Sequence, residues 1–237
     1  MRYLGGKGKI SKDIAKIIND EIGRNKSVPF VSLFCGSCSI ESKVDANIKI
    51  LNDAHPYLIS LYKALQEGYE LPNNVTREQY NWIRAHKDLD PALSGFVGFG
   101  CSFGGRWFGG YAIGKRADGV QERNYCNEGK RETLRTFCGV SNAEFYNLDY
   151  RAVPIPDNSI IYCDPPYNGT TGYSTGKFNS DEFWDYVRGL SSTHKVFVSE
   201  ESAPKDFECI WEKKVTRTLD RNKNNQPSKI ERVFTKT

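Results

Sequence analysis

The chain has 237 residues, of which 38% are hydrophobic, 13% aromatic and 26% charged. This composition supports a packed core and argues against intrinsic disorder, and the length suits one domain with a moderate insertion. No apolar run approaches the roughly 18 residues that span a bilayer, and the first ten residues lack the apolar segment of a secretory signal. We therefore expect a cytoplasmic protein with no membrane partner. The sequence indicates no oligomeric state.

The positive charge is unevenly distributed. The net charge is only +4, but eight Lys and Arg stand against two acidic residues from Lys213 onward. A segment of this kind suits the phosphate backbone of a nucleic acid. A solvated charged edge is the alternative interpretation.

The seven cysteines predict free thiols and no metal site. An odd number in a chain without an export signal is typical of a reducing compartment. The only CxxC pair is Cys35 and Cys38, and the three histidines add no ligand cluster for zinc. We interpret the pair as small residues in a tight turn, with a redox dithiol as the alternative.

The first part of the chain has the pattern of a parallel sheet with nucleotide-binding loops. Apolar spacing predicts a helix over 8–22, then a strand over 28–34 that ends in Cys-Gly-Ser. A helix is expected from about residue 39, a second strand over 48–51 and a helix over 56–67. Strand, glycine turn, helix, strand and acid follow each other in doubly wound α/β folds.

The middle of the chain has a different composition. Residues 70–94 are polar and helical in pattern, whereas 95–119 hold nine of the 21 glycines, interleaved with aromatic residues. We expect that this stretch is not one regular helix, and we predict loops and a possible β-hairpin over 107–124.

The sheet pattern resumes after the glycine-rich stretch. The strands predicted there are 144–147, 159–163, 195–199, 209–216 and 230–235. A helix is expected over 180–190 with Ser180 as its N-cap. The last two strands should form a hairpin around a basic loop.

The most specific motif is Asp164-Pro165-Pro166-Tyr167, directly after an apolar strand. Two prolines cannot continue a central strand, so a carboxylate, a rigid turn and an aromatic ring stand at its carboxyl end, where ligands bind in open α/β sheets. Asp164 and the Pro165 carbonyl could accept both hydrogens of an exocyclic amine while Tyr167 stacks on its ring. A proline-rich turn capped by Asp164 is the alternative.

Two further motifs are weaker on their own. The small residues 34–39 after the first strand let a ligand approach the backbone, and Asp53 lies where an acid binds ribose hydroxyls. Asp53 could instead cap a helix. The start, Tyr3-Leu4-Gly5-Gly6-Lys7, could be a frayed terminus.

In this order the motifs resemble those of the Dam-type adenine-specific DNA methyltransferases. The resemblance extends from Arg2 to about Phe234. It implies an α/β fold with the Rossmann-like sheet of S-adenosylmethionine-dependent methyltransferases and a small, mainly helical target-recognition insertion. It also implies a catalytic, cofactor-binding domain over 1–67 and 143–237, with the insertion over 68–142.

The resemblance implies roles for individual residues. The catalytic residues would be Asp164, Pro165, Pro166 and Tyr167. The residues at S-adenosylmethionine, whose product is S-adenosylhomocysteine, would be Tyr3, Lys7, Phe34, Gly36, Asp53, Asp149 and Asp164. The contacts to double-stranded DNA are expected from Arg106, Lys115, Arg116, Arg123, Arg217, Arg221 and Lys223.

The chain departs from the family pattern at Cys38, where a second glycine is common. This departure keeps open a catalytically weak or silent DNA-binding protein. A methyltransferase acting on RNA or protein glutamine is another alternative, although those families usually begin the tetrapeptide with Asn. A dehydrogenase would need a fuller G-x-G-x-x-G, which is absent.

Overall fold

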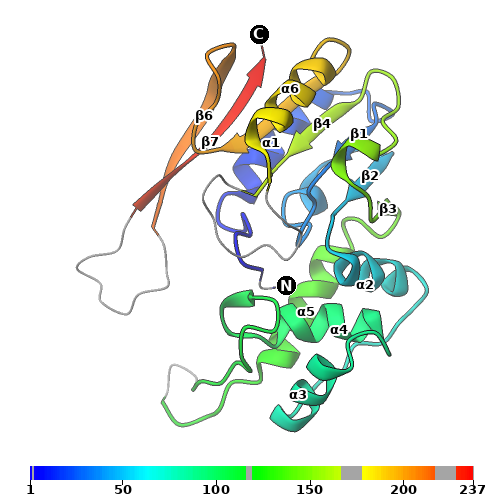
Figure 1. Cartoon of the computed structure of the whole chain (residues 1–237), viewed down its shortest axis with the longest axis vertical. Helices are drawn as coiled ribbons and strands as arrows, with labels where there is room; N and C mark the ends of the chain where they lie inside the picture. Colours follow the sequence, from blue (N-terminus) through cyan, green and yellow to red (C-terminus); the bar gives the residue numbers. More distant parts are fainter. Residues whose placement is uncertain (2, 116–118, 167–177, 217–227, 237) are drawn as a thin grey trace.

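The computed structural model describes residues 1, 3–115, 119–166, 178–216 and 228–236. Within them, seven strands form one mixed sheet in the order β3-β2-β1-β4-β5-β7-β6 (Figure 1). The strands are β1 (Phe30–Ser32), β2 (Lys49–Asn52), β3 (Glu144–Tyr146), β4 (Ile160–Cys163), β5 (Lys195–Glu200), β6 (Phe207–Thr216) and β7 (Ser228–Lys236).

The order of the sheet reverses between β1 and β4. Phe30 of β1 pairs in parallel with Lys49 of β2 on one side and with Ile160 of β4 on the other. β5 continues the parallel part, and β7 joins it antiparallel, with Ser199 opposite Val233. Ligands of doubly wound sheets bind outside the carboxyl ends of the strands at such a reversal. The Rossmann-like fold class is confirmed.

The strands β1, β2 and β4 are buried along their whole length because both faces of the sheet are covered. In β4, Ile160 and Tyr162 belong to one apolar cluster and Ile161 and Cys163 to the other. This alternation places the clusters on opposite faces. The helices α1 and α2 pack in the first cluster and α6 in the second.

The α-helices are α1 (Ser11–Ile22), α2 (Pro56–Gln66), α3 (Arg77–Ala85), α4 (Pro91–Gly100), α5 (Tyr125–Phe137) and α6 (Ser180–Leu190). Short 3-10 turns are η1 (Glu41–Lys43), η2 (Phe103–Gly105) and η3 (Tyr150–Ala152). Figure 1 shows α3, α4 and α5 grouped at one end of the molecule and the β6–β7 hairpin at the other. The chain from α3 to α5 is called the helical segment below.

Two local predictions are wrong. The helix expected from residue 39 is only the turn η1, because α1 packs against η1 and β4 and already covers that part of the sheet. The N-cap of α6 is Asn179 and not Ser180, since the Asn179 side-chain oxygen accepts from the backbone N–H groups of Asp181 and Glu182.

The glycine-rich stretch is not one regular helix, as predicted, but its first residues are helical. α4 continues through it to Gly100, and a Cβ on Gly95 would lie 2.0 Å from the Tyr57 carbonyl oxygen. Glycine here permits the close packing of α4 on α2 and does not form a turn. The possible β-hairpin over 107–124 exists in the described residues only as isolated antiparallel bridges, Ser102 with Tyr111 and Lys115 with Glu122. The hairpin of the last two strands is confirmed.

Candidate active site

Three of the predicted motifs lie at the carboxyl ends of neighbouring parallel strands. Asp164 follows β4, residues 34–38 follow β1, and Asp53 follows β2. The N-terminal segment reaches this edge as well, since the Tyr3 ring lies beside Gly36 and the Lys7 ammonium beside Asp164. Lys7 and Asp164, which are 157 positions apart in sequence, are therefore brought together at one edge of the sheet.

Lys7 lies between two carboxylates. Its Nζ is 2.8 Å from Glu231 Oε2 and 3.3 Å from Asp164 Oδ1, and only 5% of its side chain is exposed. Burial works against the ammonium, but the negative charges of Asp164 and Glu231 outweigh it and raise the Lys7 pKa. Lys7 is therefore a fixed positive charge beside the predicted catalytic carboxylate.

Asp164 lies in a group of like charges. Burial raises its pKa, the Lys7 ammonium opposes this rise, and Glu231 adds to it. Glu200, at the end of β5, has its pKa raised to about 7 by burial and by the charge of Asp164. Lys229 of β7 is 3.0 Å from Glu201 and 3.6 Å from Glu231. At this end of the sheet, the ammonium groups of Lys7 and Lys229 thus lie among four carboxylates, those of Asp164, Glu200, Glu201 and Glu231.

Asp53 is held by backbone groups. Its carboxylate accepts from the N–H of Gly36 and from the N–H of His55, both at 2.8 Å. Burial raises the Asp53 pKa, and these two hydrogen bonds oppose the rise. Asp53 does not cap α2, because the N-cap of that helix is His55. The carboxylate instead joins the loop after β1 to the loop after β2.

The glycine loop has a left-handed backbone at two positions. Gly36 has φ +47°, and a Cβ there would lie 3.1 Å from the Tyr3 ring. Cys38 has φ +54°, a conformation that glycine adopts without strain, which accounts for the glycine common at this position. The Cys38 N–H donates to the Cys35 carbonyl at 2.8 Å, so the tight-turn interpretation is confirmed. Burial raises the pKa of both thiols.

Phe34 and Asp149 lie in an aromatic region next to this loop. The Phe34 ring packs against those of Tyr150 and Phe183, with centroids 5.4 and 5.9 Å apart. Asp149 begins η3, and about half of its side chain is exposed. The Arg151 guanidinium, 2.8 Å away, lowers the Asp149 pKa.

The predicted DNA contacts are only partly described. Four of them lie outside the described residues: Arg116, Arg217, Arg221 and Lys223. The predicted catalytic residue Tyr167 lies outside them as well. Arg106 and Lys115 are exposed in the helical segment. Arg123 donates to both carboxylate oxygens of Glu128, and its guanidinium lies 4.7 Å from the Tyr125 ring centroid, so its charge is already compensated.

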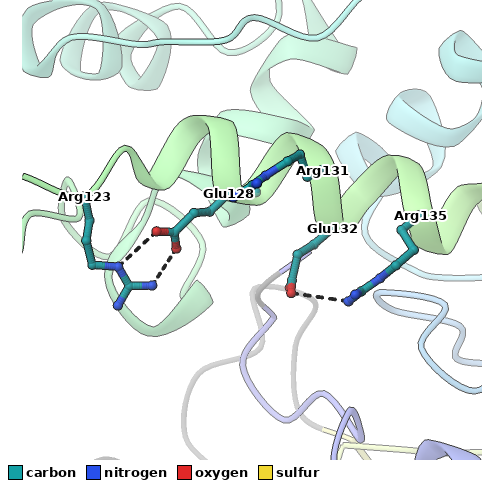
Figure 2. A pocket seen from close by; sticks show the side chains of 6 residues that line it. Arg123, Glu128, Arg131, Glu132 and Arg135 are labelled. Carbon is teal, nitrogen blue, oxygen red and sulfur yellow. Dashed lines mark hydrogen bonds and ion pairs between the residues drawn. The ribbon is translucent and has the colours of Figure 1, made fainter. Parts of the chain in front are cut away.

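A shallow pocket of about 440 Å³ lies along α5 (Figure 2). Figure 2 shows Arg123 paired with Glu128 and Arg135 paired with Glu132, with Arg131 between them. The residues that line it are Arg123, Glu128, Gly129, Arg131, Glu132 and Arg135. Among these arginines, only Arg123 was predicted from the sequence to contact DNA.

Three residues of the site, Glu231, Lys229 and His55, were missed from the sequence. Glu231 and Lys229 stand two apart in the last strand, so they point to one face of it, and both are only 14% exposed. That spacing was the available signal in the sequence. His55 was missed too: it is buried, its Nδ1 has no hydrogen-bond partner in the described part of the chain, and burial lowers its pKa to about 4.

The C-terminal hairpin has fewer open charges than its composition indicates. Lys213 forms a 2.8 Å ion pair with Asp13 of α1, and Arg232 pairs with Glu212 at 3.1 Å. Lys229 lies in the acidic group beside Asp164. Part of the predicted basic surface is thus used within the protein.

Comparison with known families supports a methyltransferase. The family model of D12 class N6 adenine-specific DNA methyltransferases matches residues 3–88. This range includes Tyr3, Lys7, Phe34, Gly36 and Asp53, so the resemblance is confirmed over these motifs. No curated protein sequence matches the chain.

Two of the solved structures that match the chain are 11% identical to it in sequence. The crystal structure of tRNA (m1A58) methyltransferase TrmI from Aquifex aeolicus is 11% identical with a TM-score of 0.41, covering 95% of this chain and 68% of that one. The structure of SMU.472, a putative methyltransferase complexed with SAH, is 11% identical with a TM-score of 0.35. That alignment covers 97% of this chain and 53% of the other.

Within the described residues there is neither a membrane-spanning helix nor a cluster of metal ligands. None of the helices found there is long and apolar enough to cross a membrane. Nor do the described His, Cys, Asp and Glu side chains gather into a group that could hold a metal ion.

Proposed function

We propose that this protein transfers a methyl group from S-adenosylmethionine to the N6 amine of adenine in duplex DNA. The observation that carries the proposal is the position of Asp164, at the carboxyl end of β4 beside Lys7, next to loops that match an N6 adenine methyltransferase family. The neighbouring prolines turn the chain out of the sheet, which leaves the carboxylate at the sheet edge.

The residues after β1 and β2 fit the cofactor. Gly36 leaves room where a Cβ would meet Tyr3, Asp53 is a buried carboxylate suited to ribose hydroxyls, and His55 holds a buried ring nitrogen without a partner among the described residues. We expect Tyr3, Phe34, Gly36, Asp53 and Asp149 to hold it, with Lys7 and Asp164 at its reactive end. When bound, it supplies a methyl group on a sulfonium sulfur that leaves as the neutral thioether of S-adenosylhomocysteine.

Asp164 and the Pro165 carbonyl would act on the target amine. The lone pair of an aromatic amine is delocalised into its ring, and acceptors on both N–H groups restore its nucleophilic character. They also fix the nitrogen in line with the methyl group. Once the new N–C bond has formed, the amine loses one proton towards Asp164 and then to solvent. Tyr167 would stack on the adenine ring.

The helical segment is proposed as the part that recognises the target. We assign residues 68–142 to recognition and 1–67 with 143–237 to catalysis. The target base must leave the duplex, which costs a few kcal/mol. Phosphate contacts would offset that cost and set the register of the protein on DNA. We propose the exposed Arg106 and Lys115 for such contacts, together with Arg123, Arg116, Arg217, Arg221 and Lys223.

The test is methyl transfer from tritiated S-adenosylmethionine to random-sequence duplex DNA, followed by digestion to nucleosides. Label in N6-methyladenine, absent with the Asp164→Ala variant, is the expected result. Sequencing of the modified adenines then gives the target site. Label in RNA or protein only, or no label at all, would overturn the proposal.

A further inference from the structure

Glu231 reaches the predicted catalytic centre from the opposite end of the chain. It stands 224 positions after Lys7, and its Oε2 is the nearer of the two carboxylate oxygens that contact the Lys7 ammonium, at 2.8 Å against 3.3 Å for Asp164. Glu231 is only 14% exposed and also faces Lys229 on its own strand. The contact is thus part of the interior of the protein and not a surface ion pair.

In this arrangement the ion pair between Lys7 and Asp164 is weakened by the second contact of Lys7, to Glu231. A single ammonium with two carboxylate partners divides its attraction between them, and the shorter contact goes to Glu231. Asp164 keeps a positive charge close by, but its ion pair is the longer one. A full ion pair on Asp164 would compete with the hydrogen bond that a target amine must donate to the same carboxylate.

We propose that Glu231 is a positioning residue that draws Lys7 away from Asp164 and so leaves the Asp164 carboxylate open to the target amine. This proposal rests on the function proposed above. Glu231 acts through Lys7 and touches neither the cofactor nor the base. Its absence would let Lys7 move closer to Asp164, the other carboxylate that it contacts.

Other charged or titratable groups around Asp164 also affect the titration of its carboxyl group. They come from the N-terminal segment, from η1, from β4 itself, from β5 and from β7. They are Lys7, Glu41, Tyr162, Cys163, Glu200, Lys229 and Glu231. A change at Glu231 leaves the other acids and Lys229 in place, so the response of the Asp164 pKa combines two effects: the loss of the Glu231 charge and the movement of Lys7.

The experiment measures the Asp164 pKa by 13C NMR of aspartate-labelled protein, with the signal assigned from the Asp164→Asn spectrum. In Glu231→Gln this pKa should fall by about one unit, because a like charge is removed and an opposite charge moves into full contact. Glu212→Gln is the matched control, since Glu212 pairs with Arg232 in the same hairpin and is not among the charges that act on Asp164. An unchanged or raised Asp164 pKa in Glu231→Gln would overturn the proposal, as would an equal fall in Glu212→Gln.

A second variant guards against loss of folding. Glu231→Asp keeps the negative charge but shortens the side chain by one methylene, which lengthens the contact to Lys7. The Asp164 pKa should then fall by less than in Glu231→Gln, and no fall at all would count against the proposal if Glu231→Gln does not fold.

Activity gives an independent reading. Methyl transfer by Glu231→Gln should drop about tenfold, and the acid limb of its pH profile should move to lower pH by the same shift as the NMR titration. A wild-type protein that methylates no DNA would refute the proposed function alone, because the NMR titration would still decide the role of Glu231.

Discussion

Asp53 and Asp164 are two carboxylates at one edge of one sheet, the first buried and the second with 21% of its side chain exposed, and they are stabilised in different ways. Asp53 accepts two backbone N–H groups, from Gly36 and His55, whose positions are fixed by the chain. Asp164 depends on the side chain of Lys7, which it shares with Glu231. Backbone donors make a rigid acceptor suited to binding, whereas a shared ammonium makes one whose charge can be rebalanced when a substrate arrives.

The difference predicts that loss of Asp164 affects catalysis most. In Asp164→Ala the target amine loses its charged acceptor, and methyl transfer should fall by about three orders of magnitude or more. Asp164→Asn should retain a trace at most, because an amide accepts more weakly than a carboxylate. Turnover is measured with tritiated cofactor, and thermal unfolding checks the fold. Near-normal turnover of the alanine variant would contradict the assigned role.

Loss of Asp53 should instead weaken cofactor binding. Asp53→Ala removes the proposed charge-assisted hydrogen bonds to ribose, which contribute about 1.5–3 kcal/mol. Calorimetry with S-adenosylhomocysteine measures the change. Asp164→Ala is the control, since it should leave a larger share of this affinity intact. Equal cofactor affinity of the wild type and Asp53→Ala would remove Asp53 from the binding site.

Much of this comparison could be predicted from the sequence because it depends on local patterns. Apolar strands followed by Asp53 or by Asp164-Pro165 place carboxylates at strand ends, and parallel strands bring these ends to one edge. The contact between Lys7 and Glu231 could not be predicted, because it depends on where an antiparallel strand is added to the sheet. No local pattern fixes the pairing of Ser199 with Val233, which sets that position.

The loop after β1 shows a second limit of sequence patterns. Its small residues correctly predicted a turn, but the helix expected from residue 39 depended on free space against this part of the sheet, next to β4. The N-terminal helix α1 fills that space. Packing from a distant segment therefore decided between a helix and the turn η1.

Glu41 is a third carboxylate that can be compared with Asp53 and Asp164. It is buried, and no ion pair among the described residues involves it. It accepts from the Ser32 hydroxyl at 2.9 Å, and burial raises its pKa from about 4.5 to about 7. A carboxyl group whose pKa is raised by folding contributes stability below its unfolded pKa and loses it as the pH rises through the folded value. The wild type should therefore lose stability between about pH 4.5 and 7 on account of Glu41.

Glu41→Gln should remove that loss. Its free energy of unfolding relative to the wild type should rise by about 2.5 kcal/mol between pH 5 and pH 8. Urea unfolding at pH 5 and pH 8 measures it. Glu67→Gln, at an exposed acid after α2, reports the effect of the substitution itself. A difference between Glu41→Gln and the wild type that does not vary with pH would contradict the raised pKa.

The smallest expected effect is on DNA binding, and it concerns two charged side chains that are exposed to solvent, unlike Lys7. Arg106 and Lys115 are exposed in the helical segment, and we expect each to contact one DNA phosphate. Their replacement by Ala should weaken binding to target and scrambled duplexes about equally, because phosphate contacts carry no sequence information. The slope of log affinity against log salt should fall by about 0.9 for each contact. Lys16→Ala, which removes an exposed charge paired with Asp20 on α1, is the control and should leave the slope unchanged. A change confined to the target duplex would mean that these side chains read bases, and an unchanged slope would place both in bulk solvent.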